Sequence, residues 1–169
     1  MDSQLRSCTV TSPIGELLLV ASEKGLVQVF LPSSKGVPAS TEERYDPSAY
    51  SLPEARRQLH AFFTGELTAF DLPLDEKGSA FQLAVWAALR EIPYGTTCSY
   101  GDIASRVGAD PRTSSRAVGL ANGSNPVAII TPCHRVIGAN GDLTGYAGGL
   151  HAKRWLLDHE AHVMGTVLF

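Results

Sequence analysis

The sequence predicts an α/β protein with a small α/β amino-terminal domain over residues 1–78 and a helical carboxy-terminal domain over residues 79–169. Two Val/Leu-rich runs near the start, separated by a short polar turn, are typical of a β-hairpin. Helical periodicity follows them and dominates the rest of the chain. The charged run Asp75–Gly78, which ends in glycine, lies between the two patterns and marks the predicted boundary.

The composition is that of a globular protein with no membrane partner. Hydrophobic residues make up 44% and charged residues 18% of the 169 residues, and no apolar run approaches the roughly 18 residues that a membrane span needs. The first ten residues lack the apolar core and small-residue cleavage site of a secretory signal. We therefore expect a cytoplasmic protein, or a nuclear one in a eukaryote.

The charge is divided unevenly along the chain. Residues 1–78 hold 7 Lys and Arg against 11 Asp and Glu, whereas residues 79–169 hold 7 against 6. Because residues 1–78 carry a net negative charge, they would repel the phosphates of a nucleic acid. Any nucleic-acid binding by the second part must depend on individual arginines and backbone amides, because it has no broad basic field.

The amino-terminal part is predicted to hold a hairpin and one helix. Residues 15–21 and 25–31 form the hairpin strands. The sequence Ser51-Leu-Pro-Glu54 fits a capping box, and apolar residues then recur at helical spacing until Gly65. Residues 70–74 alternate like a strand, and Pro73 restricts that strand to a sheet edge.

The carboxy-terminal part is predicted to be helical and rich in loops. Ser79-Ala-Phe-Gln82 fits a second capping box, opening a helix that ends before Ile92-Pro-Tyr-Gly95. Two short helices follow, over 100–107 and 113–121, and a last helix spans 152–159. Two short helices around a tight Gly/Pro turn suggest a helix-turn-helix, although plain helical hairpins share the pattern.

Cys133 is the cysteine most open to a chemical role. The chain has three cysteines and no C-x-x-C spacing, so neither a disulfide framework nor a zinc site is indicated. Cys8 and Cys98 read as small buried hydrophobes. Cys133 follows Pro132 and precedes His134 and Arg135, two cationic groups that could lower the pKa of a thiol.

An extended backbone at Cys133 would separate it from its histidine. Neighbouring side chains of an extended segment point to opposite faces, so contact between Cys133 and His134 needs a bend or a bridging water. A histidine that acts as a base also needs an acceptor to fix its tautomer. Asp142, Asp158 and Glu160 are the acidic candidates downstream, and the spacing does not choose among them.

Several ordered blocks of the sequence resemble one family. The segment Thr131-Pro-Cys-His-Arg-Val-Ile137 resembles the active-site signature of the O6-alkylguanine-DNA alkyltransferases. Four further blocks resemble that family in the same order: 92–101, 115–119, 122–126 and 145–149. Together they cover nearly all of residues 79–169, and looser matches at 11–15 and 62–66 extend the resemblance to the amino-terminal part.

The resemblance implies direct reversal of DNA damage. The carboxy-terminal domain would be a winged helix-turn-helix, and Cys133 would accept the alkyl group from O6-alkylguanine, or less readily O4-alkylthymine, after base flipping. His134 would keep Cys133 as thiolate through a water. Glu160 would be the carboxylate of this relay, and Asn125 would brace the turn that holds the three residues.

The resemblance also assigns residues to DNA and to the base. Tyr100 would help to rotate the nucleotide and donate to the departing guanine, while Arg116 would fill the gap in the duplex. Further residues of the second short helix would contact DNA, namely Ser115, Ala117 and Gly119. The base pocket would be formed by Pro132, Val136, Tyr146 and Ala147. Some relatives have a serine in place of Ala147, which leaves the preference for bulky adducts open.

The implied protein acts once and needs no cofactor or metal. A thioether has no easy hydrolysis route, so the chain would be consumed in one turnover. Some relatives bind zinc in the amino-terminal domain through two cysteines and two histidines, but here that domain holds only Cys8 and His60. The expected partner is double-stranded DNA containing O6-alkylguanine, bound by a monomer, with cooperative binding along DNA left open.

Two other functions compete with this hypothesis. A non-catalytic sensor of alkylated DNA would flip the base without reacting, but such sensors replace the nucleophile that Cys133 supplies here. A cysteine hydrolase would use a Cys-His pair in acyl transfer and turn over repeatedly. The helix-turn-helix and arginine blocks give that second alternative no support.

Overall fold

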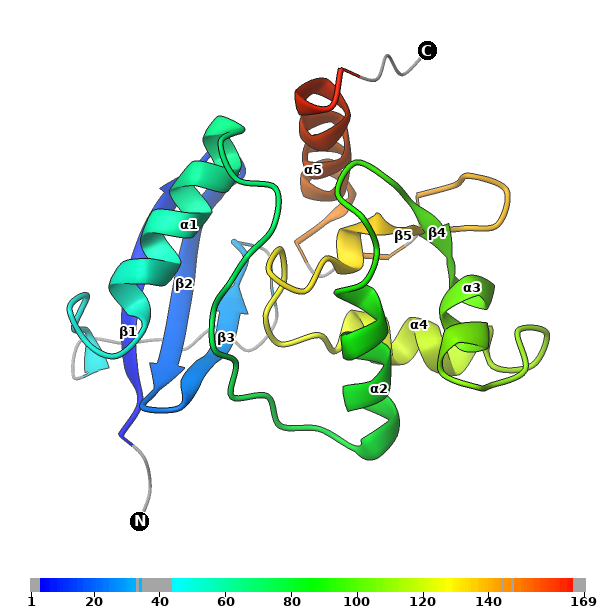
Figure 1. The fold of residues 1–169 in the computed structure, drawn as a ribbon, viewed down its shortest axis with the longest axis horizontal. Coiled ribbons are helices and arrows are strands. Elements are labelled where there is room, and N and C mark those ends of the chain that lie inside the picture. The colour runs from blue at the N-terminus through cyan, green and yellow to red at the C-terminus, as the bar shows by residue number, and fades with distance from the viewer. Residues whose placement is uncertain (1–3, 33, 35–43, 144, 147, 166–169) are drawn as a thin grey trace. The chain divides into compact units, whose positions relative to one another are not determined.

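The structure is a computed structural model that describes residues 4–32, 34, 44–143, 145–146 and 148–165. The chain divides into two compact units, Met1–Lys77 and Gly78–Phe169. Each unit has its own secondary structure and its own buried core (Figure 1). The predicted fold class, a small sheet domain followed by a helical domain, is confirmed.

The amino-terminal unit is built on a three-stranded antiparallel sheet in the order β1-β2-β3. The predicted hairpin is present as β2 (Gly15–Ser22) and β3 (Gly25–Phe30). Sequence analysis missed β1 (Arg6–Ser12), which pairs with β2 along its whole length, from Arg6 opposite Ala21 to Ser12 opposite Gly15. Its alternation of Thr, Ser and Val is the signal that indicates a half-buried strand.

Helix α1 (Leu52–Thr64) packs against β1 and β2 and buries Leu52, Leu59 and Phe62 (Figure 1). The predicted capping box at Ser51 is wrong, because the Ser51 side chain makes no capping hydrogen bond. Glu54 instead accepts from Arg57 and Gln58 on the next turn. The predicted strand over 70–74 is also wrong: within it only Leu74 forms a bridge, to Leu26.

The carboxy-terminal unit holds helices α2 (Ala80–Leu89), α3 (Tyr100–Arg106) and α4 (Ser115–Gly123). The capping box between Ser79 and Gln82 is confirmed, and Ser99 forms another with Asp102 at the start of α3. Helix α4 packs against both α2 and α3, as the second helix of a helix-turn-helix does. Trp86, Leu89, Ile103 and Val118 form the core between these helices.

The second half of this unit arranges short elements around the same core. Strand β4 (Cys98–Ser99) pairs in parallel with β5 (Val136–Ile137), and the 3-10 helix η2 (Cys133–Arg135) lies directly before β5. Helix α5 (Leu150–Val163) is longer than predicted and packs against η2. In the part of the chain that the structure describes, no helix is both long and apolar enough to cross a membrane.

Candidate functional site

Cys133 lies at the start of a tight turn. Residues 133–135 form the 3-10 helix η2, so the bend that contact between neighbouring side chains requires is present, and an extended segment is not. The Cys133 amide donates to the Thr131 carbonyl at 2.8 Å. The Cys133 side chain is only 5% exposed, and it packs into the core cluster of the carboxy-terminal unit. The thiol is therefore held in a rigid and largely dry environment.

His134 and Glu160 form a buried pair. The His134 Nε2 lies 2.6 Å from the Glu160 Oε2, and both residues are fully buried. Because a carboxylate only accepts, the neutral imidazole carries its proton on Nε2 and presents Nδ1 as an acceptor. Nδ1 is buried and makes no hydrogen bond within the described residues. Among the three acidic candidates that the sequence left open, Glu160 is the one in contact with His134.

The Glu160 carboxylate accepts from more than its histidine. Arg135 donates from Nε to Oε1 at 2.8 Å and from Nη2 to Oε2 at 3.0 Å, and the Gly95 amide donates to Oε1 at 3.1 Å. The Tyr94 ring lies 5.4 Å from the Arg135 guanidinium carbon, within range of a cation–π contact. Burial acts to raise the pKa of Glu160, but His134 and Arg135 outweigh it and lower the pKa to about 2.

Burial also sets the protonation of the neighbouring groups. It raises the pKa of the Cys133 thiol, while Asn125 and the charge of Lys153 act to lower it. It lowers the pKa of His134, against the effect of Glu160. The sequence suggested that Arg135 could lower the pKa of the thiol; in the structure its guanidinium donates to Glu160 and to the Ile92 carbonyl, each at 2.8 Å.

Sequence analysis missed Lys153 as a site residue. Lys153 is fully buried on α5, and its ammonium donates to the Val136 carbonyl at 2.6 Å. On the same helix, Arg154 lies 3.7 Å from Asp158. Residues 153, 156 and 160 recur at helical spacing, so the pattern that buries Leu156 and Glu160 could have placed Lys153 on the same face.

Asn125 fastens the loop that leads into the turn at Cys133. Its Nδ2 donates to the Thr131 carbonyl at 2.8 Å, and its Oδ1 accepts from the Val127 amide at 3.0 Å. Ile129, between these anchors, has φ of 75°, which a β-branched residue adopts only when its surroundings hold it there. The two bonds from Asn125 supply part of that constraint.

The residues expected to touch DNA lie on the helix-turn-helix. Arg116 and Ala117 are exposed on α4, and the Ser115 hydroxyl donates to the Pro111 carbonyl at 2.8 Å. A Cβ on Gly119 would lie 3.9 Å from the Tyr100 ring, so the ring passes close to the α4 backbone. Tyr100 also packs against the core cluster that contains Cys133. The structure thus brings Tyr100 and Gly119 together and leaves Arg116 facing solvent.

Three of the expected pocket residues lie in or against the core that contains Cys133 or next to it in the chain. Pro132 and Val136 are buried on either side of η2, and Tyr146 packs against the same core cluster. The Tyr146 hydroxyl is buried, and burial together with the negative charges of Cys133 and Glu160 raises the tyrosine's pKa. Ala147 lies outside the described residues.

Neither of the other cysteines belongs to this cluster of charged groups. Cys8 is fully buried in the amino-terminal unit, where burial raises its pKa to about 11. Cys98 is half-buried on β4, and burial raises its pKa too. Among the described residues, no three His, Cys, Asp or Glu side chains are grouped as metal ligands would be.

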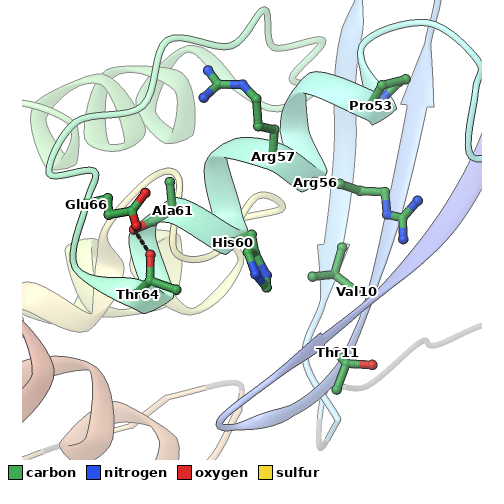
Figure 2. A pocket seen from close by; sticks show the side chains of 9 residues that line it. All are labelled: Val10, Thr11, Pro53, Arg56, Arg57, His60, Ala61, Thr64 and Glu66. Atoms are coloured by element: carbon green, nitrogen blue, oxygen red, sulfur yellow. Dashed lines mark hydrogen bonds between the residues drawn. The ribbon is translucent and has the colours of Figure 1, made fainter.

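A cavity of about 700 Å³ lies apart from this chemistry, in the amino-terminal unit along α1 and β1 (Figure 2). None of the predicted site residues line it. The side chains of Arg56, Arg57 and His60, which line it, point in different directions in Figure 2 and do not converge on one point. We therefore take the residues around Cys133 as the candidate functional site.

Two family models match consecutive parts of the chain. The model described as "6-O-methylguanine DNA methyltransferase, ribonuclease-like domain" matches residues 5–76. The model described as "6-O-methylguanine DNA methyltransferase, DNA binding domain" matches residues 80–162. Together the two matches span nearly the whole chain.

Individual proteins are similar over the same length. A methylated-DNA–protein-cysteine methyltransferase of Mycobacterium tuberculosis is 52% identical over 152 residues, which is 90% of each chain. One of Methanosarcina acetivorans is 54% identical over 150 residues, which is 88% of this chain and 94% of the relative. The crystal structure of M. tuberculosis OGT in complex with DNA is similar with a TM-score of 0.84 and 49% identity, covering 94% of this chain and 93% of the other.

Proposed function

Because the chain belongs to the 6-O-methylguanine DNA methyltransferase family, we propose that it repairs DNA by moving the alkyl group of O6-alkylguanine onto its own Cys133. The chain is a methylated-DNA–protein-cysteine methyltransferase, an enzyme that transfers an alkyl group from DNA to a protein cysteine. The observation that supports Cys133 as the acceptor is its place beside the buried His134–Glu160 pair.

The His134–Glu160 pair is suited to removing the thiol proton. A free thiol with a pKa near 8.5 is mostly protonated at neutral pH, and only the thiolate is a competent nucleophile. Glu160 orients His134 so that Nδ1 is an acceptor, and the lowered pKa of His134 keeps the imidazole neutral and ready to accept. A water between Nδ1 and the Cys133 sulfur would carry the proton.

The transfer itself is a displacement at the alkyl carbon. The Cys133 sulfur forms the new S–C bond while the bond between that carbon and guanine O6 breaks, and the electron pair stays on the guanine. The guanine anion is a poor leaving group, so a proton donor at the ring lowers the barrier. We assign that role to the Tyr100 hydroxyl, because the Tyr100 ring packs against the core cluster that contains Cys133.

The target carbon is stacked inside duplex DNA, so the base must be extruded before sulfur can reach it. Arg116, exposed on α4, is the side chain that would fill the gap, and Ser115, Ala117 and Gly119 on the same helix would follow the DNA backbone. A positively charged side chain exposed on a helix can contact both the DNA phosphates and the base edges in a groove.

The flipped base would lie against the turn that holds Cys133. The carbonyls of Cys133 and Val136 would accept from the guanine amino group, while Pro132 and Tyr146, with Ala147 in the same loop, would enclose the ring. Val136 already accepts from Lys153, but a carbonyl has two lone pairs and can take a second donor. O4-alkylthymine would be a poorer substrate of the same pocket.

After the transfer the protein can accept no further alkyl group, because Cys133 has become a thioether. It has no easy hydrolysis route, so each chain reacts once and uses no cofactor. We further propose that the chain acts as a monomer on double-stranded DNA, in the cytoplasm or in the nucleus of a eukaryote. Cooperative binding along DNA is tested by titrating undamaged duplexes of increasing length.

Intact-protein mass spectrometry tests the proposed acceptor. Incubation with a duplex carrying one O6-methylguanine should add ~14 Da, saturating at one equivalent, and peptide mapping should place the methyl group on Cys133. Cys133→Ala should lose the gain in mass. Cys98→Ala, a matched change of a half-buried cysteine in the same unit, should keep it. Tight binding without any gain in mass would instead support a damage sensor, and repeated turnover would support a hydrolase.

A further inference from the structure

Several hydrogen bonds converge on Thr131, two residues before the thiol. Thr131 is fully buried, and its amide donates to the Val127 carbonyl at 2.9 Å. Its carbonyl accepts from the Asn125 side chain and from the Cys133 amide, each at 2.8 Å. Its hydroxyl accepts from Arg90 Nη1, also at 2.8 Å. Because the Cys133 amide is bonded directly to Thr131, a displacement of Thr131 would also displace the thiol.

Arg90 is the one of these four partners that comes from outside the loop. It ends helix α2, lies 41 positions before Thr131 in the chain, and is exposed. The other three partners all belong to residues 125–133 and would move together with the loop. The bond from Arg90 therefore fastens Thr131 to a separate element of the fold.

Helix α2 is a suitable fixed point, because it also holds the end of α4. Gln82 Nε2 donates to the Ser124 hydroxyl at 3.2 Å, and Trp86 Nε1 donates to the Ala121 carbonyl at 2.9 Å. Gln82, Trp86 and Arg90 are each four positions apart, so the three donors lie along one side of the helix. One side of α2 thus holds both the end of α4 and the loop that leads to the thiol.

We propose that Arg90 is a positioning residue for the transfer reaction. By holding the Thr131 hydroxyl, it keeps the Cys133 sulfur aligned with the alkyl carbon of the extruded base, although it touches neither the substrate nor the sulfur itself. This role deepens the proposed function and rests on it. Displacement depends steeply on alignment, and a misplacement of about 1 Å can slow such a reaction about 100-fold.

The backbone of the same loop shows why an outside tie is needed. Ile129 has φ of 75°, a conformation that costs a β-branched residue free energy and persists only where the surroundings hold it. Asn125 supplies part of that restraint from within the loop. When the bond from Arg90 is lost, Ile129 can relax toward an ordinary conformation, and the residues that follow it, including Cys133, would shift.

Single-turnover transfer with methylated duplex in excess tests the proposal. Arg90→Met removes the donor and keeps the aliphatic stem, whereas Thr131→Val removes the acceptor and keeps the branched shape. Each should lower the transfer rate at saturating DNA about tenfold and leave the DNA concentration for half the maximal rate unchanged. Arg90→Lys, which keeps a donor, should restore most of the rate. Arg154→Met, at an exposed arginine near Asp158 in the same unit, is the matched control and should change neither quantity.

Two further measurements separate positioning from a general loss of stability. Because the two residues act through one bond, the double variant Arg90→Met/Thr131→Val should transfer no more slowly than the slower single variant. Amide hydrogen exchange followed by NMR, without DNA, should be faster at Thr131 and Cys133 in both single variants and unchanged in Arg154→Met.

Three results would overturn the proposal. The first is an unchanged transfer rate in Arg90→Met, even with faster exchange at Thr131, which would leave Arg90 as a brace of the fold alone. The second is a double variant whose rate loss is the product of the two single losses. The third is a wild-type protein that gains no methyl group from DNA, which would contradict the proposed function itself and is recognised before any variant is compared.

Discussion

The two units bury polar groups of different kinds. In the part of the amino-terminal unit that the structure describes, the buried polar side chains are neutral: Ser7, Ser22 and Gln58. Its ion pairs, such as Glu54 with Arg57, lie at the surface. Among its described residues, the carboxy-terminal unit buries four ionisable polar side chains besides the Cys133 thiol: His134, Arg135, Lys153 and Glu160. Buried charge seldom adds stability, so its concentration beside one thiol points to chemistry as the reason for keeping it.

The two units also share structural devices, and this makes the difference testable. Each has a carboxylate held by an arginine, a side-chain amide that bridges backbone groups, and a glycine in the left-handed region. Matched substitutions can therefore be compared between the units, and only those in the carboxy-terminal unit should slow transfer.

The largest effect is expected from Glu160→Gln. It leaves the buried Arg135 without an anion, and breaking a buried pair in this way costs about 3–5 kcal/mol. Alkyl transfer should be slowed strongly as well, since Gln keeps one acceptor oxygen where His134, Arg135 and the Gly95 amide now use two. The matched change Glu54→Gln removes an exposed pair and should leave both stability and transfer near wild-type. Urea unfolding measures the stability of each variant, and a transfer assay measures its activity. Equal destabilisation by Glu160→Gln and Glu54→Gln would contradict the expected difference between the two units.

Acid should weaken the carboxy-terminal unit first. The pKa of Glu160 is about 2 in the folded state against an ordinary 4.5, so its contribution is complete above pH 4.5 and is lost as pH falls toward 2. That difference corresponds to about 3 kcal/mol. The pKa of His134 is lowered as well, so protonation of the unfolded chain already favours unfolding below about pH 6.5.

Hydrogen exchange between pH 7 and pH 3 measures this acid sensitivity in each unit. Amides of α5 should lose protection before those of β2, after correction for the intrinsic exchange rate. In the variant His134→Gln, the loss of α5 protection just below pH 6.5 should disappear, because the titrating imidazole is gone. The loss of α5 protection toward pH 2, which depends on Glu160, should remain. Parallel loss of protection in α5 and β2 would show that the buried charges do not decide acid stability.

Short-range sequence patterns were enough to predict most of the fold and to single out Cys133 as the candidate reactive thiol. The capping box at Ser79 and the hairpin around residues 22–25 follow from short-range rules and are present. The capping box at Ser51 failed because Glu54 has a competing partner one turn later, in Arg57. That competition depends on side-chain geometry that spacing does not specify.

The electrostatic partners could not be read from neighbouring positions. Arg135 directly follows His134, yet its guanidinium pairs with Glu160, which lies 25 positions further along the chain. The cation that does act on Cys133 is Lys153, on a different helix. Sequence adjacency predicts proximity, but the direction of each side chain out of a 3-10 turn decides which charges meet.

An intermediate effect is expected from Asn125→Ala. Both hydrogen bonds that hold the loop before Cys133 are lost; the Thr131 carbonyl keeps its bond from the Cys133 amide, but the buried Val127 amide loses its acceptor, at a cost of about 1–3 kcal/mol. Gln58→Ala is the matched change, since Gln58 bonds both the amide and the carbonyl of Asp71. We expect similar losses in urea unfolding from both variants, and slower transfer only from Asn125→Ala. Slower transfer from Gln58→Ala would mean that loss of stability alone explains both.

The smallest effect is expected from Gly95→Ala. Its φ of 78° costs a non-glycine residue about 1–2 kcal/mol, and the new Cβ would lie 2.6 Å from the Met164 Cγ, which can move because Met164 is exposed. Gly65→Ala, at the left-handed end of α1 with φ of 85°, should cost a similar amount. The Gly95 amide donates to Glu160, so only Gly95→Ala should shift the carboxylate and slow single-turnover transfer, by a few-fold. If both variants lose the same stability but only Gly95→Ala slows transfer, the Gly95 backbone acts on the site through Glu160, whereas the Gly65 backbone only ends helix α1.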